Sequence, residues 1–267
     1  MSDLQQARDG DIAIIRLNRP AKRNALSDAL VHELGDVVDS LPREVRAIVL
    51  AGNGAHFCAG LDLSELNDLD AAEGAEHSRM WHRVFDRIQF GRVPVVAARQ
   101  GAVIGGGLEL ACCAQVRVAE PSTFYALPEG QRGIFVGGGG SVRIPRLVGV
   151  ARMADMMLTG RVYRAEEGER VGFAQYLVGA GEGLAKAIEL AKKIAGNAAM
   201  TNYAVMHALP RIADAGARGR FVSRSHDRRY QPGRARGQGQ GARVSRWQSQ
   251  EGGCGMIDGK ARKVGAE

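Results

Sequence analysis

Two carboxylates, Glu109 and Glu129, have the type and setting that acid–base chemistry requires. Glu109 comes shortly after the glycine run 105–107, and Glu129 follows Pro128 in a predicted loop. Two carboxylates across a cleft can share general acid–base catalysis, because one gives a proton while the other takes one. A solvated surface position is the alternative for Glu129. The spacing along the chain does not by itself show that the two side chains meet.

The glycines before Glu109 predict a sharp turn from a strand into a helix. Glycine permits tight turns and lets a ligand approach the main-chain N–H groups. The apolar run 108–114 predicts a helix that opens at this turn. Because a helix N-terminus carries unpaired N–H donors and partial positive charge, such a turn can bind an oxyanion. An ordinary tight turn with a solvated Glu109 is the alternative for this stretch on its own.

Alternating strands and helices are predicted to position these residues. Apolar and β-branched runs predict strands at 12–17, 47–51, 94–98 and 115–119, a strand end at 57–63 and a strand near 123–124. Helices are predicted at 27–38, with Ser27 as the N-cap, and at 72–90. The alternation over the first 120 residues predicts an α/β fold. After Gly140 the pattern predicts helices at 141–147, 151–158, 165–171, 183–195 and 200–211, with a short strand at 175–178.

Length and composition limit the class of protein. The 267 residues are 45% hydrophobic, which is enough for one large domain. The sequence contains no run of about 18 apolar residues, so no membrane span is expected. The N-terminus lacks the features of a signal peptide. The four cysteines and six histidines match neither a zinc site nor a disulfide framework. A cytoplasmic protein is therefore expected.

The positive charge is concentrated at the end of the chain. Residues 1–216 carry 24 Lys and Arg against 25 Asp and Glu, whereas residues 217–267 carry 12 against 4. A nucleic-acid-binding main body is therefore not favoured. Residues 217–255 include nine Arg, eight Gly and five Gln and show no helical or strand period. The hypotheses for them are a shifted reading frame, a solvated disordered tail, or a basic tail that binds RNA.

Five motifs, in order, resemble the crotonase (enoyl-CoA hydratase/isomerase) superfamily. They are Leu17-Asn18-Arg19-Pro20 with Asn24-Ala25-Leu26, residues 57–63, residues 105–111, Pro128-Glu129 followed by Gly138-Gly139-Gly140, and Leu158-Thr159-Gly160. The match covers about residues 5–215. The resemblance implies an α/β fold, a crotonase-like spiral of ββα units followed by a helical C-terminal region. It places the spiral core at 1–198 and a helical trimerisation region at 199–267, in which 217–255 is atypical.

The resemblance also implies an activity. The family binds acyl thioesters of coenzyme A, and its oxyanion hole corresponds to the backbone N–H groups of Leu61 and Gly106. The two catalytic glutamates of the hydratases correspond to Glu109 and Glu129, whereas many isomerases keep only one. An enoyl-CoA hydratase that adds water reversibly to a trans-2-enoyl-CoA is therefore favoured. The alternatives are an isomerase or another crotonase-type enzyme and, in another class, a non-catalytic or RNA-binding protein on the same fold.

Further site residues follow from the same resemblance. The residues expected to bind the substrate and its coenzyme A moiety are Ala21, Lys22, Arg23, Asn24, Ala25, Ala59, Gly60, Asp62, Leu63, Ile104, Gly105 and Pro128. Lys22 and Arg23 could contact phosphates or be solvated turn cations. Val136 lies where the family usually has a proline, and Gly137-Gly138-Gly139-Gly140 is interpreted as a packing turn rather than a phosphate cradle. No metal or redox cofactor and no membrane partner are expected, and the chain is expected to form a trimer or a dimer of trimers.

Overall fold

The larger of two β-sheets forms the centre of the fold. The structure is a computed structural model that describes residues 2–65 and 70–214. The sheet has six strands in the order β1-β2-β3-β4-β6-β9, and only β1 runs antiparallel to its neighbour. Their bounds are β1 Leu4–Asp9, β2 Ile12–Leu17, β3 Ala47–Gly52, β4 Val95–Arg99, β6 Val116–Ala119 and β9 Tyr176–Leu177. The mixed α/β architecture predicted from the sequence is confirmed.

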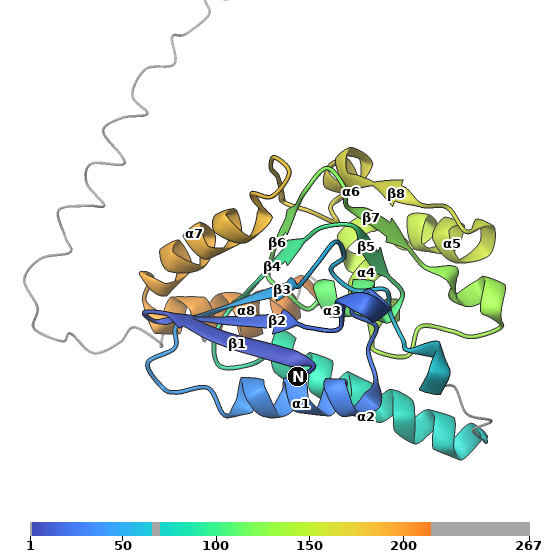
Figure 1. Cartoon of the computed structure of the whole chain (residues 1–267), viewed down its shortest axis with the longest axis horizontal. Coiled ribbons are helices and arrows are strands. Elements are labelled where there is room, and N and C mark those ends of the chain that lie inside the picture. The colour runs from blue at the N-terminus through green and yellow to red at the C-terminus, as the bar shows by residue number, and fades with distance from the viewer. Residues whose placement is uncertain (1, 66–69, 215–267) are drawn as a thin grey trace, which may run out of the picture. The chain divides into compact units, whose positions relative to one another are not determined.

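Helices cover both faces of this sheet, which explains why its central strands β3 and β4 are apolar apart from Arg99 at the end of β4. Ile14, Val49 and Val96 form one row across β2, β3 and β4. This row packs against α7 (Gly183–Ala195), whereas the neighbouring row faces α1 (Asp28–Asp39) and α2 (Ala71–Gln89). Figure 1 shows α7 on one side of the strands and α1 and α2 on the other.

The smaller sheet leads into the glycine turn, defined here as residues 105–107. It contains β5 (Ala102–Ile104), β7 (Phe124–Ala126) and β8 (Tyr163–Arg164), and the chain leaves β5 through Gly105 into α3 (Gly106–Ala111). The helix predicted over 108–114 therefore begins two residues earlier and ends three residues earlier. It ends early because the chain must turn back to the large sheet, where Gln115 N–H donates to the carbonyl of Val95.

The other predicted helices occur close to their expected positions. They are α4 Gly140–Val148, α5 Val150–Thr159, α6 Ala165–Val171 and α8 Ala199–Asp214. Ser27 caps α1 as predicted, since its side chain accepts the N–H of Leu30. Short 3-10 helices are η1 Pro20–Lys22, η2 Leu63–Glu65 and η3 Pro128–Arg132.

Two local predictions differ from the structure. Residues 57–63 were expected to contain a strand end, but the structure has only isolated bridges there, from Cys58 to Val103 and from Leu61 to Leu26. Small residues turn the chain so often that no ladder develops. The edge strand β1 was not predicted, because only Leu4 of its six residues is buried and the rest are exposed.

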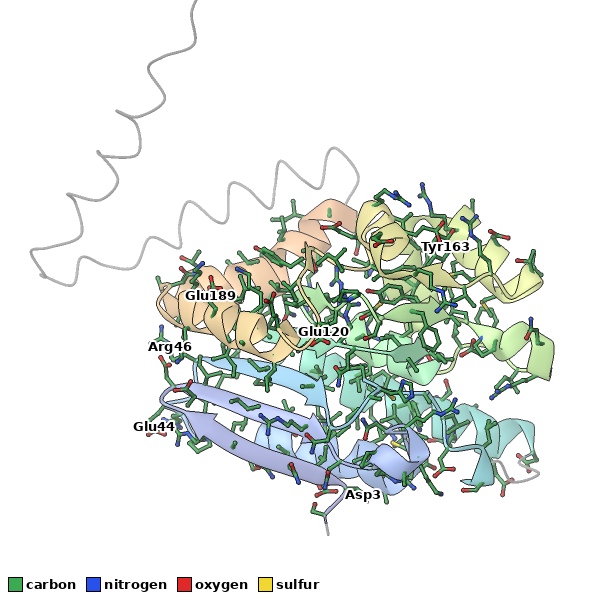
Figure 2. The ribbon with its side chains drawn as sticks, turned by 45° about the horizontal axis from the view of Figure 1, so that its top comes forward. Asp3, Glu44, Arg46, Glu120, Tyr163 and Glu189 are labelled. Atoms are coloured by element: carbon green, nitrogen blue, oxygen red, sulfur yellow. The ribbon has the colours of Figure 1, made fainter. Side chains whose placement is uncertain are left out.

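Polar contacts fix α7 on the face of the sheet away from α1 and α2. Glu120, just after β6, accepts the N–H groups of Gly181 and Gly183 at 3.0 Å each, and so satisfies donors where the helix begins. Arg46, just before β3, donates to the carbonyl of Asn197 at 2.8 Å. Figure 2 labels Glu120 and Arg46 together with Glu189, which lies on α7 itself.

Several predictions concern residues outside the described part of the chain. The atypical stretch 217–255, its three hypotheses and Cys254 all lie there. The domain boundary near residue 198 stays a prediction. Within residues 2–65 and 70–214, no helix is long and apolar enough to cross a membrane.

Candidate active site

Glu109 and Glu129 line one cavity of about 350 Å³. Their exposed fractions are 3% and 6%, so the solvated alternative is wrong for both side chains. The residues that line the cavity come from α2, α3, η3 and the two loops after β3 and η3. They are Leu61, Gly74, His77, Ser78, Trp81, Gly106, Glu109, Glu129, Ile134, Phe135, Val136, Gly137 and Gly138.

Glu109 is held by the glycine loop, defined here as residues 137–140. Its Oε1 accepts the N–H of Gly138 at 2.9 Å and that of Gly140 at 2.7 Å. Burial raises the pKa of Glu109, while these two donors and the charge of Arg143 oppose the rise. The loop thus packs against the cavity and anchors a carboxylate, and its N–H groups at 138 and 140 are not free for a phosphate.

Glu129 lies in η3 beside the glycine turn. Its Oε2 is buried and has no hydrogen-bond partner among the residues that the structure describes. Burial raises the pKa of Glu129 to about 7, and the charge of Glu109 adds to the rise. A Cβ at position 105 would lie 2.7 Å from Glu129 Oε1, so Gly105 is needed for this approach. The carboxyl can therefore exchange a proton near neutral pH.

Two residues that line the same cavity, Leu61 and Gly106, have free N–H groups. Leu61 and Gly106 are close together, since a Cβ at position 106 would lie 3.7 Å from the N of Leu61. Neither N–H group has an acceptor in the described part of the chain. Trp81 packs against Gly106, where the same Cβ would lie 2.8 Å from the indole ring. Paired donors of this kind can stabilise a negatively charged oxygen.

A second cavity, of about 40 Å³, adjoins the first and shares Leu61, Gly106, Glu129 and Ile134 with it. Six residues expected to bind the substrate line this second cavity: Ala59, Gly60, Leu63, Ile104, Gly105 and Pro128. The structure thus brings these predicted residues together beside the two carboxylates and the two free N–H groups.

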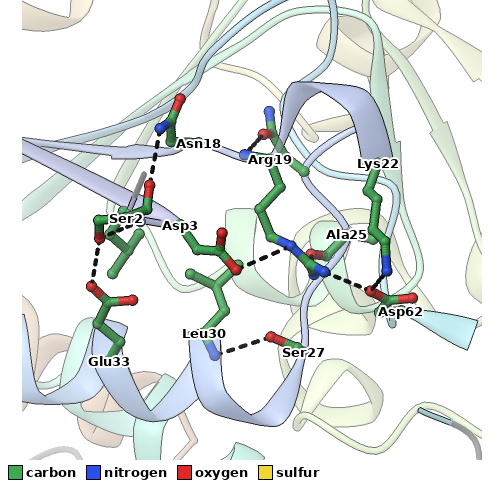
Figure 3. A network of polar contacts seen from close by, with 12 residues as sticks. Ser2, Asp3, Asn18, Arg19, Lys22, Ala25, Ser27, Leu30, Glu33 and Asp62 are labelled. Atoms are coloured by element: carbon green, nitrogen blue, oxygen red, sulfur yellow. Dashed lines mark hydrogen bonds and ion pairs between the residues drawn. The ribbon is translucent and has the colours of Figure 1, made fainter. Parts of the chain in front are cut away.

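The remaining predicted residues, Ala21 to Ala25 and Asp62, line neither cavity. Lys22 Nζ and Arg19 Nη2 each lie 2.8 Å from Asp62 Oδ2 (Figure 3). The hydrogen bond from Lys22, with further ones from Ser64 and Arg19, holds the pKa of Asp62 well below its usual range. Lys22 is therefore an ion-paired cation at a half-exposed position.

Asn24 has a structural position in the same loop. Its side chain is fully buried and donates to the carbonyls of Asn53 and His56 at 2.9 and 2.7 Å. It also accepts the N–H of Arg19 at 2.8 Å. Asn24 and Arg23 both adopt positive φ, so these hydrogen bonds stabilise a tight left-handed turn.

The sequence did not identify the contribution of α2 to the cavity. His77 and Trp81 lie one turn apart, and His77 Nε2 and Trp81 Nε1 each lie 2.8 Å from Asp28 Oδ1. Their spacing of four residues was the available signal, since it places both on one helix face. Arg143 was also missed, because nothing local distinguishes it from the other arginines of α4 and α5.

No group of three or more His, Cys, Asp or Glu side chains could hold a metal ion within the described ranges 2–65 and 70–214. Cys58, Cys112 and Cys113 are buried and free, and burial raises the pKa of Cys58 to about 12. Such thiols stay protonated and unreactive at neutral pH. His56 accepts the N–H of Ala102, in line with a structural position.

The fold and this cavity define a crotonase-type protein, and comparisons with known proteins agree. The family model for enoyl-CoA hydratase/isomerase matches residues 7–222. A crystal structure from Rhodopseudomonas palustris, assigned as an enoyl-CoA hydratase, is 60% identical with a TM-score of 0.82 and covers 84% of this chain and 86% of that one. The chain therefore belongs to the enoyl-CoA hydratase/isomerase family.

Curated relatives have similar names. The short-chain-enoyl-CoA hydratase of Clostridium acetobutylicum is 34% identical over 194 residues, which are 72% of this chain and 74% of that protein. The enoyl-CoA isomerase/hydratase claC of Penicillium crustosum is 40% identical over 178 residues. This match covers 64% of the present chain but only 20% of the length of claC.

Proposed function

We propose that this protein is an enoyl-CoA hydratase, a hydro-lyase that adds water reversibly across the 2,3 double bond of a trans-2-enoyl-CoA. One observation supports this most strongly. Two buried carboxylates, Glu109 and Glu129, line the cavity that also contains the free N–H groups of Leu61 and Gly106. Addition of water to a conjugated thioester needs a base, an acid and donors for the developing enolate oxygen, and this set supplies all three.

In the proposed mechanism Glu109 acts as the base. Its carboxylate takes a proton from a water molecule, and the oxygen of that water forms a bond to C3 of the enoyl group. The electrons of the double bond move onto the thioester oxygen, which the N–H groups of Leu61 and Gly106 stabilise as an enolate. One such donor contributes roughly 3–4 kcal/mol in other acyl-transfer enzymes.

Glu129 completes the addition. It helps to hold the water and donates its proton to Cα, which gives the 3-hydroxyacyl thioester. Its pKa of about 7 supports this role, because a substantial fraction of the side chain carries the proton at neutral pH. The reaction written in this way requires no metal or redox cofactor, and coenzyme A enters as part of the substrate.

The test is an assay in which the purified protein is mixed with crotonyl-CoA and the decrease in the conjugated enoyl-thioester absorbance is measured. Glu109→Gln and Glu129→Gln should each lower kcat by about 10²- to 10⁴-fold, because each removes one acid–base group. Glu44→Gln is the matched control, since Glu44 is exposed in the loop before β3, and it should retain wild-type activity. Full activity in either active-site variant would contradict the two-carboxylate mechanism.

An enoyl-CoA isomerase is the second candidate, and the unpartnered Oε2 of Glu129 favours it. A single carboxyl of this kind can move a proton between two carbons of a 3-enoyl thioester. The two enzymes differ in product. A hydratase forms a 3-hydroxyacyl thioester from a 2-enoyl-CoA, whereas an isomerase forms the 2-enoyl thioester from a 3-enoyl-CoA and leaves crotonyl-CoA unchanged.

A further inference from the structure

Arg143 is a buried cation that joins α2 to the glycine loop. Its side chain is only 6% exposed. Nη1 donates to the carbonyl of Gly138 at 2.7 Å, and Nε donates to Oε1 of Gln89 at 2.5 Å. Nη2 forms an ion pair with Asp86. Every nitrogen of the guanidinium is therefore used, and a rigid, planar group fixes the direction of all three contacts.

The residue that Arg143 holds is one of the two that hold Glu109. Gly138 presents its carbonyl to Arg143 and its N–H to Glu109, and Gly140 presents a second N–H to the same carboxylate oxygen. A shift of the Gly138 carbonyl would rotate the neighbouring peptide groups and misdirect these donors. The geometry of Glu109 thus depends on a contact that Glu109 does not make itself.

The glycine loop has no side chains with which to fix its own position. A Cβ at position 138 would lie 2.8 Å from the ring of Phe85, and one at position 140 would lie 2.6 Å from Cγ of Glu109. The loop must therefore be anchored from outside. Ser78 Oγ donates to the carbonyl of Gly137 at 2.7 Å, and Arg143 supplies the second anchor and the only charged one of the two.

We propose that Arg143 is a positioning residue for the reaction, which fixes the Gly138 and Gly140 N–H groups on Glu109 and so keeps this carboxylate oriented as a base. The proposal rests on the role proposed above for Glu109. Arg143 does not line the cavity and makes no contact with the space for the substrate. Its effect on catalysis passes entirely through the glycine loop and through its charge.

Several charged and titratable groups surround Glu109. Arg143 of α4 favours the carboxylate, and Asp86 of α2 partly offsets that charge. Glu129 of η3 acts in the opposite direction to Arg143, and Arg132 lies beyond Glu129 on the same element. The thiol of Cys113, two residues after the end of α3, also interacts with Glu109, and burial raises the pKa of this thiol. Loss of Arg143 leaves burial less opposed, so the pKa of Glu109 should rise.

The decisive experiment is the pH dependence of hydration in Arg143→Met, Arg143→Lys and a control. Arg143→Met should lower kcat about 10- to 100-fold, because a misdirected base costs rate, and should leave KM within about twofold. The acid limb of kcat/KM should move upward by about one pH unit. Arg143→Lys keeps the positive charge but lacks the planar guanidinium. It should therefore leave the acid limb of kcat/KM at its wild-type pH and recover part of kcat.

Arg146→Met is the matched control, since Arg146 lies one turn further along α4, is half-exposed and pairs with Asp214. It should match the wild type in rate and pH profile. A folded Arg143→Met protein with wild-type kcat and an unmoved acid limb would overturn the proposal. If Arg143→Met does not fold, Gln89→Met decides, because it removes the Nε contact without changing charge. It should lower kcat about two- to fivefold, and an unchanged kcat would overturn the proposal.

A second measurement separates this proposal from the proposed function. Denaturation midpoints are compared for Arg143→Met alone and in a Glu109→Gln background at pH 8. If Arg143 acts on the Glu109 carboxylate, its substitution should lower the midpoint less when that charge is absent. Equal shifts in both backgrounds would overturn the proposal. Because this comparison needs no turnover, it remains decisive even if the wild-type protein fails to hydrate crotonyl-CoA.

Discussion

At the scale of single residues, the site contains two buried carboxylates whose hydrogen-bond partners differ. Glu109 has two N–H donors on one oxygen, whereas one oxygen of Glu129 has no partner in the described structure. Burial raises the pKa of both, and in Glu109 the donors and Arg143 oppose that rise. This difference in environment supports the proposed assignment of Glu109 as the base and Glu129 as the acid.

The burial of Glu129 should be visible in stability. Its pKa is about 7 in the folded protein against an ordinary value of 4.5. Below pH 4.5 the carboxyl is protonated in both the folded and the unfolded states. Between pH 4.5 and 7 the unfolded chain ionises first, so the free energy of unfolding falls as pH rises. Above pH 7 the folded protein bears the full cost of ionising the buried Glu129 carboxyl, and its free energy of unfolding is lower by about 3 kcal/mol.

Glu129→Gln removes this ionisation. Between pH 4.5 and pH 8.5 the wild type should therefore lose up to about 3 kcal/mol of its free energy of unfolding relative to the variant. Urea denaturation at several pH values measures it, with Glu44→Gln as the exposed control. A difference that does not change with pH would contradict the raised pKa.

At the scale of elements, the glycine loop and α3 fit together without room for side chains. Gly140 is the clearest case, since a Cβ there would lie 2.6 Å from Cγ and 2.7 Å from Oε1 of Glu109. A Cβ at position 106 would likewise lie 2.8 Å from the ring of Trp81, and one at position 107 would lie 2.5 Å from the carbonyl oxygen of Cys58. Small residues at these positions let the Glu109 carboxylate, two loops and α2 approach closely.

Gly140→Ala tests this packing. We expect the substitution to lower the free energy of unfolding by about 1–3 kcal/mol, because the added methyl group overpacks the site. It should also lower hydration activity by displacing Glu109. Gly196→Ala is the matched control, since Gly196 has φ of −71° at the end of α7 and a Cβ there meets nothing nearer than 3.5 Å.

The control should leave the free energy of unfolding unchanged or raise it by up to about 1 kcal/mol, since alanine restricts the unfolded chain. Thermal or urea denaturation of the two variants beside the wild type gives both values. Equal stability of Gly140→Ala and the wild type would show that the loop can move away from Glu109 at little cost.

At the scale of the whole molecule, apolar side chains remain exposed on α5 and α8. Val150 and Leu158 of α5 are 73% and 83% exposed, and Leu209 of α8 is 57% exposed. Exposed apolar side chains of this size are a feature of surfaces that bind another protein chain. They support the prediction that copies of this chain associate as a trimer or a dimer of trimers.

Light scattering on the purified protein tests this association. The chain mass is 28.5 kDa, and we expect a particle with a mass of three or six chains. Leu158→Glu should shift the mass toward that of a single chain, because it places a charge on an apolar contact surface. A wild-type particle with the mass of one chain would contradict the prediction.

The sequence by itself predicted most of the elements, though not β1, and ten of the residues that line the two cavities. Continuous apolar runs predicted β2, β3 and β4, and helical periodicity predicted α1, because both patterns reflect the burial of residues close together along the chain. The motifs around Gly106 and Glu129 placed the chain in its family. Local order of this kind depends on residues close in sequence, so a sequence can reveal it.

Only the tertiary structure decided how these residues act together. The sequence left Glu129 open between surface and cleft, and the fold buries it beside Glu109. Lys22 was open between a phosphate contact and a solvated cation, and the fold pairs it with Asp62, 40 residues away. Arg143 acquires its role only because α2 and the glycine loop converge on it. Burial, pKa and orientation arise from through-space contacts between distant segments, and no local pattern encodes them.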